Sequence, residues 1–224
     1  MARAMFEPVY RKMFPFWDAL SEQDRTFLCD NTLAMGYPKG ATLHDGTTCS
    51  GVFLVAKGCL RVYMLSEDGK EVTLYRLHAG DMCMLSASCV LQTLTFDVLV
   101  NAEEPTECYV IAGAAFAEVA SRYPDVKIFS LELAVSRFSE VMWAMQQILF
   151  MSMDKRLAVF LSDESARIGT DVVPLTHEQI AKYIGSAREV VSRVLKYFAA
   201  EGIVELSRKG VKITDKQRLR ALAL

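Results

Sequence analysis

The sequence lacks the features that mark membrane-spanning, exported and low-complexity chains. Its longest apolar runs, such as residues 108–117, are about half as long as a spanning helix requires. Arg11, Lys12 and Asp18 interrupt the N-terminal stretch, so the apolar core of a signal peptide is missing. No internal repeat and no compositionally biased segment occurs. We therefore expect a soluble, cytoplasmic protein without a membrane partner.

Paired cysteines are also missing, although the chain contains six cysteines. No CxxC pair occurs, and His44, His78 and His177 do not stand with cysteines at the spacing of zinc ligands. In a reducing compartment, scattered cysteines are most often buried small side chains or free thiols. The sequence therefore predicts no metal site. The cysteines are Cys29, Cys49, Cys59, Cys83, Cys89 and Cys108.

The charge is divided unevenly between two parts of the chain. From Asp154 onward, 13 Lys and Arg face 9 Asp and Glu, a balance of +4, whereas the preceding residues hold 12 against 18, a balance of −6. A basic C-terminal part behind an acidic remainder is compatible with a nucleic-acid partner. Many domains reach +4 without such a partner, so the function must be argued from motifs.

The first half of the chain predicts an antiparallel β-domain. Residues 1–35 favour short helices, with Ser21 as a helix N-cap. From Gly36 onward, short apolar runs alternate with glycines, and residues 60–77 form a β-hairpin pattern around an Asp68-Gly69 turn. Strands at this spacing predict an antiparallel barrel or a jelly roll (double-stranded β-helix) that ends near Ile111.

A long helix is predicted from about residue 126 to residue 153. It contains no glycine or proline, and apolar residues recur at alternating spacings of four and three, which is a heptad seam. The other side is apolar as well, so the helix needs two partners, for which we expect the β-domain and a second copy of the chain. The seam consists of Leu131, Val135, Phe138, Met142, Met145 and Leu149, followed by Ser152. The other side carries Ile128, Leu133, Val141, Ile148 and Met151.

The last third predicts three helices and a hairpin. Thr176 and Gln179 form a capping box, and Ser186 with Glu189 predicts a second one that opens a helix ending near Ala200. Its buried stripe is expected to be Val190, Val191, Val194, Leu195 and Phe198. A Gly turn between two short helices, followed by a basic hairpin turn at residues 207–210, is typical of a winged helix-turn-helix. The complete prediction is an α+β protein with a sensing domain at 1–125, a dimerisation helix at 126–153 and a DNA-binding domain at 154–224.

The second helix of the motif carries side chains suited to the DNA major groove. Arg193 can donate twice to guanine, Glu189 can accept from cytosine, and Arg188 and Ser192 lie on the same face. Simpler roles compete with these: Glu189 as the capping partner, the arginines as a solvated face, and Ser192 as a merely tolerated small residue. The predicted phosphate contacts are Lys182, Lys196, Arg208, Lys209 and Lys212.

Five segments together resemble the Crp/Fnr transcription regulators over nearly the whole chain. They are PKGATL (38–43), VAKGCLRVY (55–63), DGKEVTLYRL (68–77), AGDM (79–82) and LTHEQIAKYIGSAREVVSRVLK (175–196). The resemblance implies a β-roll sensor, a homodimer, a palindromic DNA site and recruitment of RNA polymerase. On the reader helix, Glu189, Ser192 and Arg193 match the oxygen-sensing branch, whereas Arg188, Glu189 and Arg193 match the cyclic-AMP branch.

The sensor segment departs from the ligand patterns of those branches. It holds no arginine between Arg76 and Arg122, which argues against cyclic AMP, and its first cysteine is Cys29, which argues against an N-terminal iron–sulfur cluster. It also resembles the carbon-monoxide-sensing haem regulators, although their Cys-x-His would fall on Met84 and Ser86. A thiol role and an apolar effector remain alternatives. The candidate effector pocket is Met82, Cys83, Met84, Ser86, Ser88 and Cys89.

Two other function classes compete with that of a DNA-binding regulator. A C-terminal module that binds protein would expose apolar residues where this sequence has Arg188, Glu189, Ser192 and Arg193. An enzyme would require a nucleophile with its base, or a phosphate loop, and the sequence shows neither. His177 is explained more simply as the first residue of a helix.

Overall fold

The computed structural model describes residues 2–46, 51–67, 69, 71–84 and 98–223. The chain divides into two compact units. The first comprises residues 1–66 and 74–140, and the second comprises residues 67–73 and 141–224. Among the described residues, no helix combines the length and the apolar character needed to cross a membrane.

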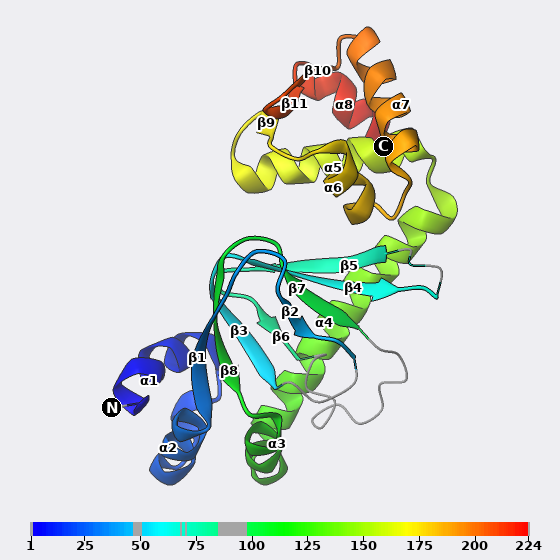
Figure 1. The fold of residues 1–224 in the computed structure, drawn as a ribbon. Coiled ribbons are helices and arrows are strands. Elements are labelled where there is room, and N and C mark those ends of the chain that lie inside the picture. The colour runs from blue at the N-terminus through cyan, green and yellow to red at the C-terminus, as the bar shows by residue number, and fades with distance from the viewer. Residues whose placement is uncertain (1, 47–50, 68, 70, 85–97, 224) are drawn as a thin grey trace. The chain divides into compact units, whose positions relative to one another are not determined.

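Within the described residues, the first unit contains two antiparallel four-stranded sheets, whose strands are labelled in Figure 1. One has the order β1 (Thr32–Tyr37), β8 (Thr106–Ile111), β3 (Val52–Lys57) and β6 (Met82–Cys83). The other has the order β2 (Thr42–His44), β7 (Leu99–Ala102), β4 (Cys59–Leu65) and β5 (Glu71–His78). The predicted β-roll, its hairpin and its end at Ile111 are confirmed. Gly69 of the predicted turn has a left-handed conformation, with φ +81°, while Asp68 lies outside the described residues.

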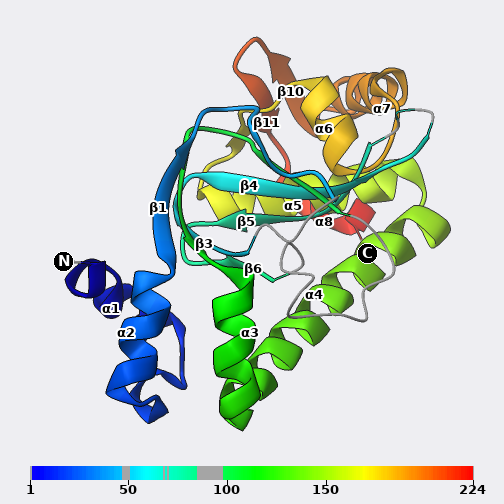
Figure 2. The same cartoon turned by 60° about the horizontal axis from the view of Figure 1, so that its bottom comes forward.

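Helices α1 (Ala2–Met13), α2 (Glu22–Asp30) and α3 (Gly113–Arg122) complete this unit, with a short 3₁₀ turn at Trp17–Ala19. Ser21 caps α2 as predicted, because its hydroxyl accepts a hydrogen bond from Asp24 N. Helix α3 was not predicted from the sequence. It leads into helix α4 (Pro124–Phe150) through a turn at Tyr123, which is visible in Figure 2.

The start of α4 is fixed by aromatic packing and a buried carboxylate. Phe129 of α4 lies edge-on to Phe14 and Phe16, with ring centroids 5.9 and 5.3 Å apart. Asp24 pairs with Arg122 at 2.8 Å and accepts a hydrogen bond from the Tyr123 hydroxyl at 2.6 Å. These contacts fix which face of α4 turns toward the first unit.

Helix α4 ends at Phe150, three residues earlier than predicted. Ser152 has extended backbone angles and is the N-cap of the next helix, α5 (Met153–Ile168). A polar residue with this conformation is favoured at a helix start. Ser152 is the polar last member of the predicted seam, so the seam loses its apolar character where the helix ends.

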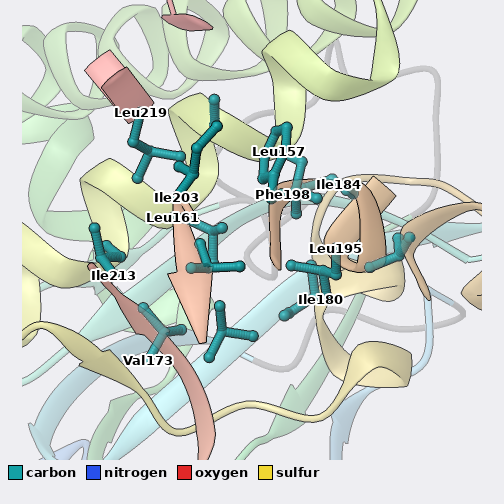
Figure 3. Packing of buried hydrophobic residues seen from close by; sticks show 14 of the residues in the cluster. Leu157, Leu161, Val173, Ile180, Ile184, Leu195, Phe198, Ile203, Ile213 and Leu219 are labelled. Carbon is teal, nitrogen blue, oxygen red and sulfur yellow. The ribbon is translucent and has the colours of Figure 1, made fainter. Parts of the chain in front are cut away.

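The second unit folds around one hydrophobic cluster, shown in Figure 3. Large side chains from three helices lie together in this cluster with no or almost no exposed surface. They are Leu157 and Leu161 of α5, Ile180 of the first motif helix, and Leu195 and Phe198 of the second. Its remaining elements are β9 (Val172–Val173), α6 (His177–Tyr183), α7 (Arg188–Ala200), β10 (Val204–Ser207), β11 (Gly210–Ile213) and α8 (Lys216–Ala223). The small sheet has the order β10-β11-β9. The winged helix-turn-helix is therefore present as predicted.

Candidate nucleic-acid interface

Helix α6 begins with the capping box that the sequence predicts. Gln179 N donates to the Thr176 hydroxyl at 3.2 Å, and Thr176 N donates to the Gln179 side-chain oxygen at 2.9 Å. Ile180 and Ile184 turn into the cluster of the second unit. The cap therefore fixes where the motif begins.

The second predicted capping box, at Ser186 and Glu189, is wrong. Gly185 adopts a left-handed conformation with φ +60°, and Ser186 N donates to Ala181 O at 2.9 Å. This six-residue closure is the Schellman ending of α6, so Ser186 belongs to the turn. Ala187 is the N-cap of α7, without a side-chain hydrogen bond. Glu189 is therefore the second residue of α7 and is not a capping partner.

Helix α7 buries one face and exposes another. Val191, Leu195 and Phe198 have no exposed surface, whereas Val190 and Val194 are half-buried rather than fully buried as predicted. The exposed face carries the predicted base-reading residues Arg188, Glu189 and Arg193, with Ser192 half-buried beside them. Within the part of the chain that the structure describes, neither arginine forms an ion pair and Glu189 has no basic partner. These groups are available to a ligand.

The hairpin of β10 and β11 presents two lysines and an arginine with different surroundings. Arg208 and Lys209 are exposed at the turn, where Lys209 N donates to the Ser207 hydroxyl at 3.1 Å. Lys212 on β11 lies 3.2 Å from the Glu205 carboxylate on the paired strand. Lys209 therefore presents a freer positive charge than Lys212.

Two further predicted phosphate contacts lie on the motif helices. The amino group of Lys182 on α6 lies 3.6 Å from the Glu71 carboxylate. The backbone oxygen of Lys182 accepts a hydrogen bond from the Thr73 hydroxyl. Lys196 of α7 is exposed. A phosphate contact by Lys182 would compete with Glu71.

A cavity of about 390 Å³, which we call the wing pocket, lies between the start of α6, the start of α7 and the hairpin turn. His177 lines it, although the sequence explained this residue only as the first of a helix. Burial lowers the pKa of His177 below its usual value, and the charges of Arg188 and Lys196 lower it further. The lining residues are Pro174, Leu175, Thr176, His177, Glu178, Arg188, Ser207, Arg208, Lys209 and Gly210.

The predicted dimerisation seam is an exposed apolar face of α4. Phe138 is 63% exposed, and the other apolar seam members are between 43% and 64% exposed. Ile128 is 50% exposed and lies three residues before Leu131, so it extends the seam rather than the opposite side as predicted. Ile148 is also exposed, at 39%. The side of α4 turned to the first unit instead holds Val126, Ser130 and the half-buried Leu133 and Arg137.

The candidate effector residues are only partly described. Met82, Cys83 and Met84 are buried, whereas Ser86, Ser88 and Cys89 lie outside the described residues. Cys29, Cys59, Cys83 and Cys108 are buried, reduced cysteines, in line with their predicted role. Burial raises the pKa of Cys108 to about 12, so this thiol stays protonated and unreactive.

The sequence reasoning missed Arg137, which brings a positive charge to the β-roll from α4. Its guanidinium lies 5.1 Å from the centre of the Tyr75 ring. It is 2.7 Å from the Glu140 carboxylate and 3.9 Å from that of Asp81. No spacing rule connects residue 137 with residues 75 and 81, so only the tertiary fold reveals this group.

The comparisons with known proteins agree with this architecture in both parts of the chain. Residues 36–123 match the cyclic nucleotide-binding domain family, and residues 155–222 match the Crp-like helix-turn-helix domain family. The chain is 30% identical to the transcriptional activator protein FnrA of Stutzerimonas stutzeri, over 92% of this chain and 86% of that protein. It is 27% identical to the probable transcriptional regulator flp of Lacticaseibacillus casei, over 93% and 95%.

A solved structure is also similar over its whole length. It is a transcriptional regulator of the Crp/Fnr family from Eubacterium rectale, with a TM-score of 0.89 and 41% sequence identity. The match covers 95% of this chain and 99% of that chain.

Proposed function

The chain belongs to the Crp/Fnr family of transcription regulators, and from this premise we propose that it acts as a cytoplasmic homodimer on a palindromic DNA site under the control of a small signal at the β-roll. Its C-terminal domain is a Crp-like helix-turn-helix. Recruitment of RNA polymerase is part of the same proposal, by family resemblance.

The exposed face of α7 carries the proposal for base recognition. Arg193 is exposed and suits guanine O6 and N7, while the exposed Glu189 suits the amino group of cytosine. Because Glu189 is not a capping partner, we propose base contact as its main role. Arg208 and Lys209 on the hairpin suit phosphates, which orient the protein without selecting a sequence.

The apolar seam of α4 supports the homodimer. Contiguous exposed apolar surface on a helix marks an interface, and the heptad spacing of this face fits a second copy of the same helix. A two-fold axis through such a seam would present two α7 helices to DNA. A protein dimer with this symmetry selects a palindrome, because each half-site meets the same residues.

The surroundings of Arg137 bear on the chemistry of the signal. Its single positive charge faces the carboxylates of Asp81 and Glu140, so this group offers no net positive charge to a phosphate. We therefore keep cyclic AMP as a disfavoured effector. The buried Met82 and Met84 favour an apolar or weakly polar effector, and haem remains an alternative. Absorption and mass spectra of freshly purified protein would detect haem, an iron–sulfur cluster or a carried ligand.

Binding-site selection from random duplex DNA tests the recognition proposal. We expect the wild-type protein to enrich a palindrome, and Arg193→Ala to lose selectivity at one guanine of each half-site. The cost is roughly 1–3 kcal/mol per bidentate contact. Glu189→Ala should relax the paired cytosine position with little change in melting temperature.

Lys209→Ala is the matched control, because it should weaken all sequences alike and leave the selected motif unchanged. An unaltered motif with Glu189→Ala would remove Glu189 from base recognition. A wild-type protein that enriches no sequence would instead favour a C-terminal module that binds protein.

A further inference from the structure

The wing pocket contains more positive than negative charge. The pocket is lined by Arg188 from the start of α7 and by Arg208 and Lys209 from the hairpin turn. Glu178 is the one carboxylate among the lining residues. Its volume of about 390 Å³ far exceeds that of a phosphate group. Three cations arranged around a cavity of this kind form a site for an anionic oxygen group.

The pocket joins the elements that a winged helix-turn-helix places on DNA. It lies between the beginning of the reader helix and the tip of the hairpin, whose basic residues are the proposed phosphate contacts. In protein–DNA complexes, more than half of the hydrogen bonds reach phosphate or sugar. A DNA phosphate is therefore the anion that this cavity would meet once α7 lies in the major groove.

His177 is the titratable group of the pocket in the neutral pH range. It is half-buried, and the charged groups around it are Arg188 and Lys196 of α7, Glu178 of its own helix, and the hairpin pair Arg208 and Lys209. Burial and the two α7 cations hold its pKa low, so the free protein carries a neutral imidazole at pH 7. The other two histidines, His44 and His78, belong to the first unit.

We propose that the wing pocket takes one DNA phosphate and that His177 gains a proton as the phosphate enters, so that DNA binding strengthens as the pH falls. The inference rests on the proposed DNA-binding function and adds a proton-linked contact to it. The permanent negative charge of the phosphate offsets Arg188 and Lys196 and stabilises the imidazolium, which then donates a hydrogen bond that neutral His177 makes less strongly. The proton comes from solvent, and no bond other than N–H is formed.

The sign of the pH dependence follows from this linkage. The pKa of His177 is higher in the complex than in the free protein, so proton uptake occurs between these two values. In that interval, the affinity for DNA falls by up to about tenfold for each half-site when the pH rises by one unit. Below the pKa of His177 in the free protein, the affinity no longer depends on pH through this group. Cysteine and lysine titrate above this interval, and an ordinary carboxylate titrates below it.

Binding titrations from about pH 5 to about pH 8 test the inference. The probes are the duplex recovered by selection and a scrambled duplex, since a phosphate contact acts on both. We expect the wild-type affinity to rise with falling pH. His177→Gln should flatten this dependence, and His177→Arg should bind tightly with no dependence. Glu178→Gln, which alters the neighbouring titratable group of the same pocket, should keep the wild-type slope.

Calorimetry in two buffers of different ionisation enthalpy measures the proton directly on the wild-type protein. We expect proton uptake of up to about one proton per protomer, largest in the interval of steepest dependence. This measurement holds even where a His177 variant folds poorly, which its melting temperature would show.

The outcomes separate the two proposals. A pH-independent affinity, or a slope that His177→Gln leaves unchanged while Glu178→Gln removes it, would overturn the role of His177 and leave the DNA-binding proposal standing. A wild-type protein that binds neither duplex at any pH would overturn the proposed function itself.

Discussion

Truncation of Phe138 offers a quantitative test of the homodimer, because this side chain lies near the middle of the seam on α4. A phenylalanine side chain presents about 200 Å² of surface, so an exposed fraction of 63% leaves about 125 Å² open in one protomer. A symmetric contact covers this surface twice. At about 25 cal/mol per Å², complete burial of both copies would contribute about 6 kcal/mol to dimerisation.

Phe138→Ala removes only part of this contribution. The alanine methyl group stays buried, and neighbouring seam residues relax toward the gap. We expect a loss of about 3 kcal/mol, which weakens the dimer roughly a hundredfold. Sedimentation equilibrium over a range of protein concentrations measures this change directly.

Trp143→Ala is the matched control for this prediction. Trp143 is 45% exposed and sits on the same helix, but it lies one residue after Met142 and so faces away from the seam. Its truncation should leave the dissociation constant nearly unchanged. A Phe138→Ala protein that sediments like the wild type, or a Trp143→Ala protein that dissociates equally, would refute the seam as the interface.

Three smaller changes test other parts of the structure. Gly210→Ala should destabilise the second unit by about 2 kcal/mol or more in chemical denaturation, because its φ of +124° suits glycine and a Cβ would collide with Val173 O. Asp24→Asn should lower the melting temperature at neutral pH. Hydrogen bonds to its carboxylate lower the pKa of Asp24, so the stability it contributes is present above its unfolded pKa and is lost as the pH falls through the lower folded value. A difference in melting temperature that does not shrink as the pH falls below the unfolded pKa would contradict this. Lys209→Ala should reduce the salt dependence of DNA binding by about one unit per phosphate contact, whereas Lys212→Ala should reduce it less because Glu205 already neutralises that lysine.

The sequence predicted those elements that a repeating pattern or a local cap specifies. The heptad spacing identified α4, and Thr176 with Gln179 identified the start of α6. Helix α3 was missed because the apolar run at residues 108–117 joins the end of strand β8 to the start of the helix. Its N-cap, Ala112, provides no capping hydrogen bond. The helix begins at Gly113, but without a polar N-cap before this glycine the sequence does not mark where the strand ends and the helix starts.

Two features were beyond sequence reasoning for different physical reasons. The sequence S-A-R-E fits a capping box at Ser186, but the left-handed Gly185 allows Ser186 N to close the preceding helix instead. The choice between the two depends on backbone geometry that neighbouring residues impose. Arg137 could not be connected with Tyr75 from spacing, because a ring contact across more than 60 residues has no sequence period.

Because Ser186 closes α6 and does not cap α7, the carboxylate of Glu189 has no capping role. A carboxylate in the first turn of a helix gains a modest favourable interaction with the helix dipole. On a surface that meets DNA, the same carboxylate repels the phosphate backbone, and this repulsion opposes binding to every sequence alike. A cytosine amino group would turn this cost into selectivity, because only a site that presents the donor at the right position offsets it. We therefore expect Glu189 to contribute to discrimination more than to affinity, so its replacement should alter the selected motif before it alters the melting temperature.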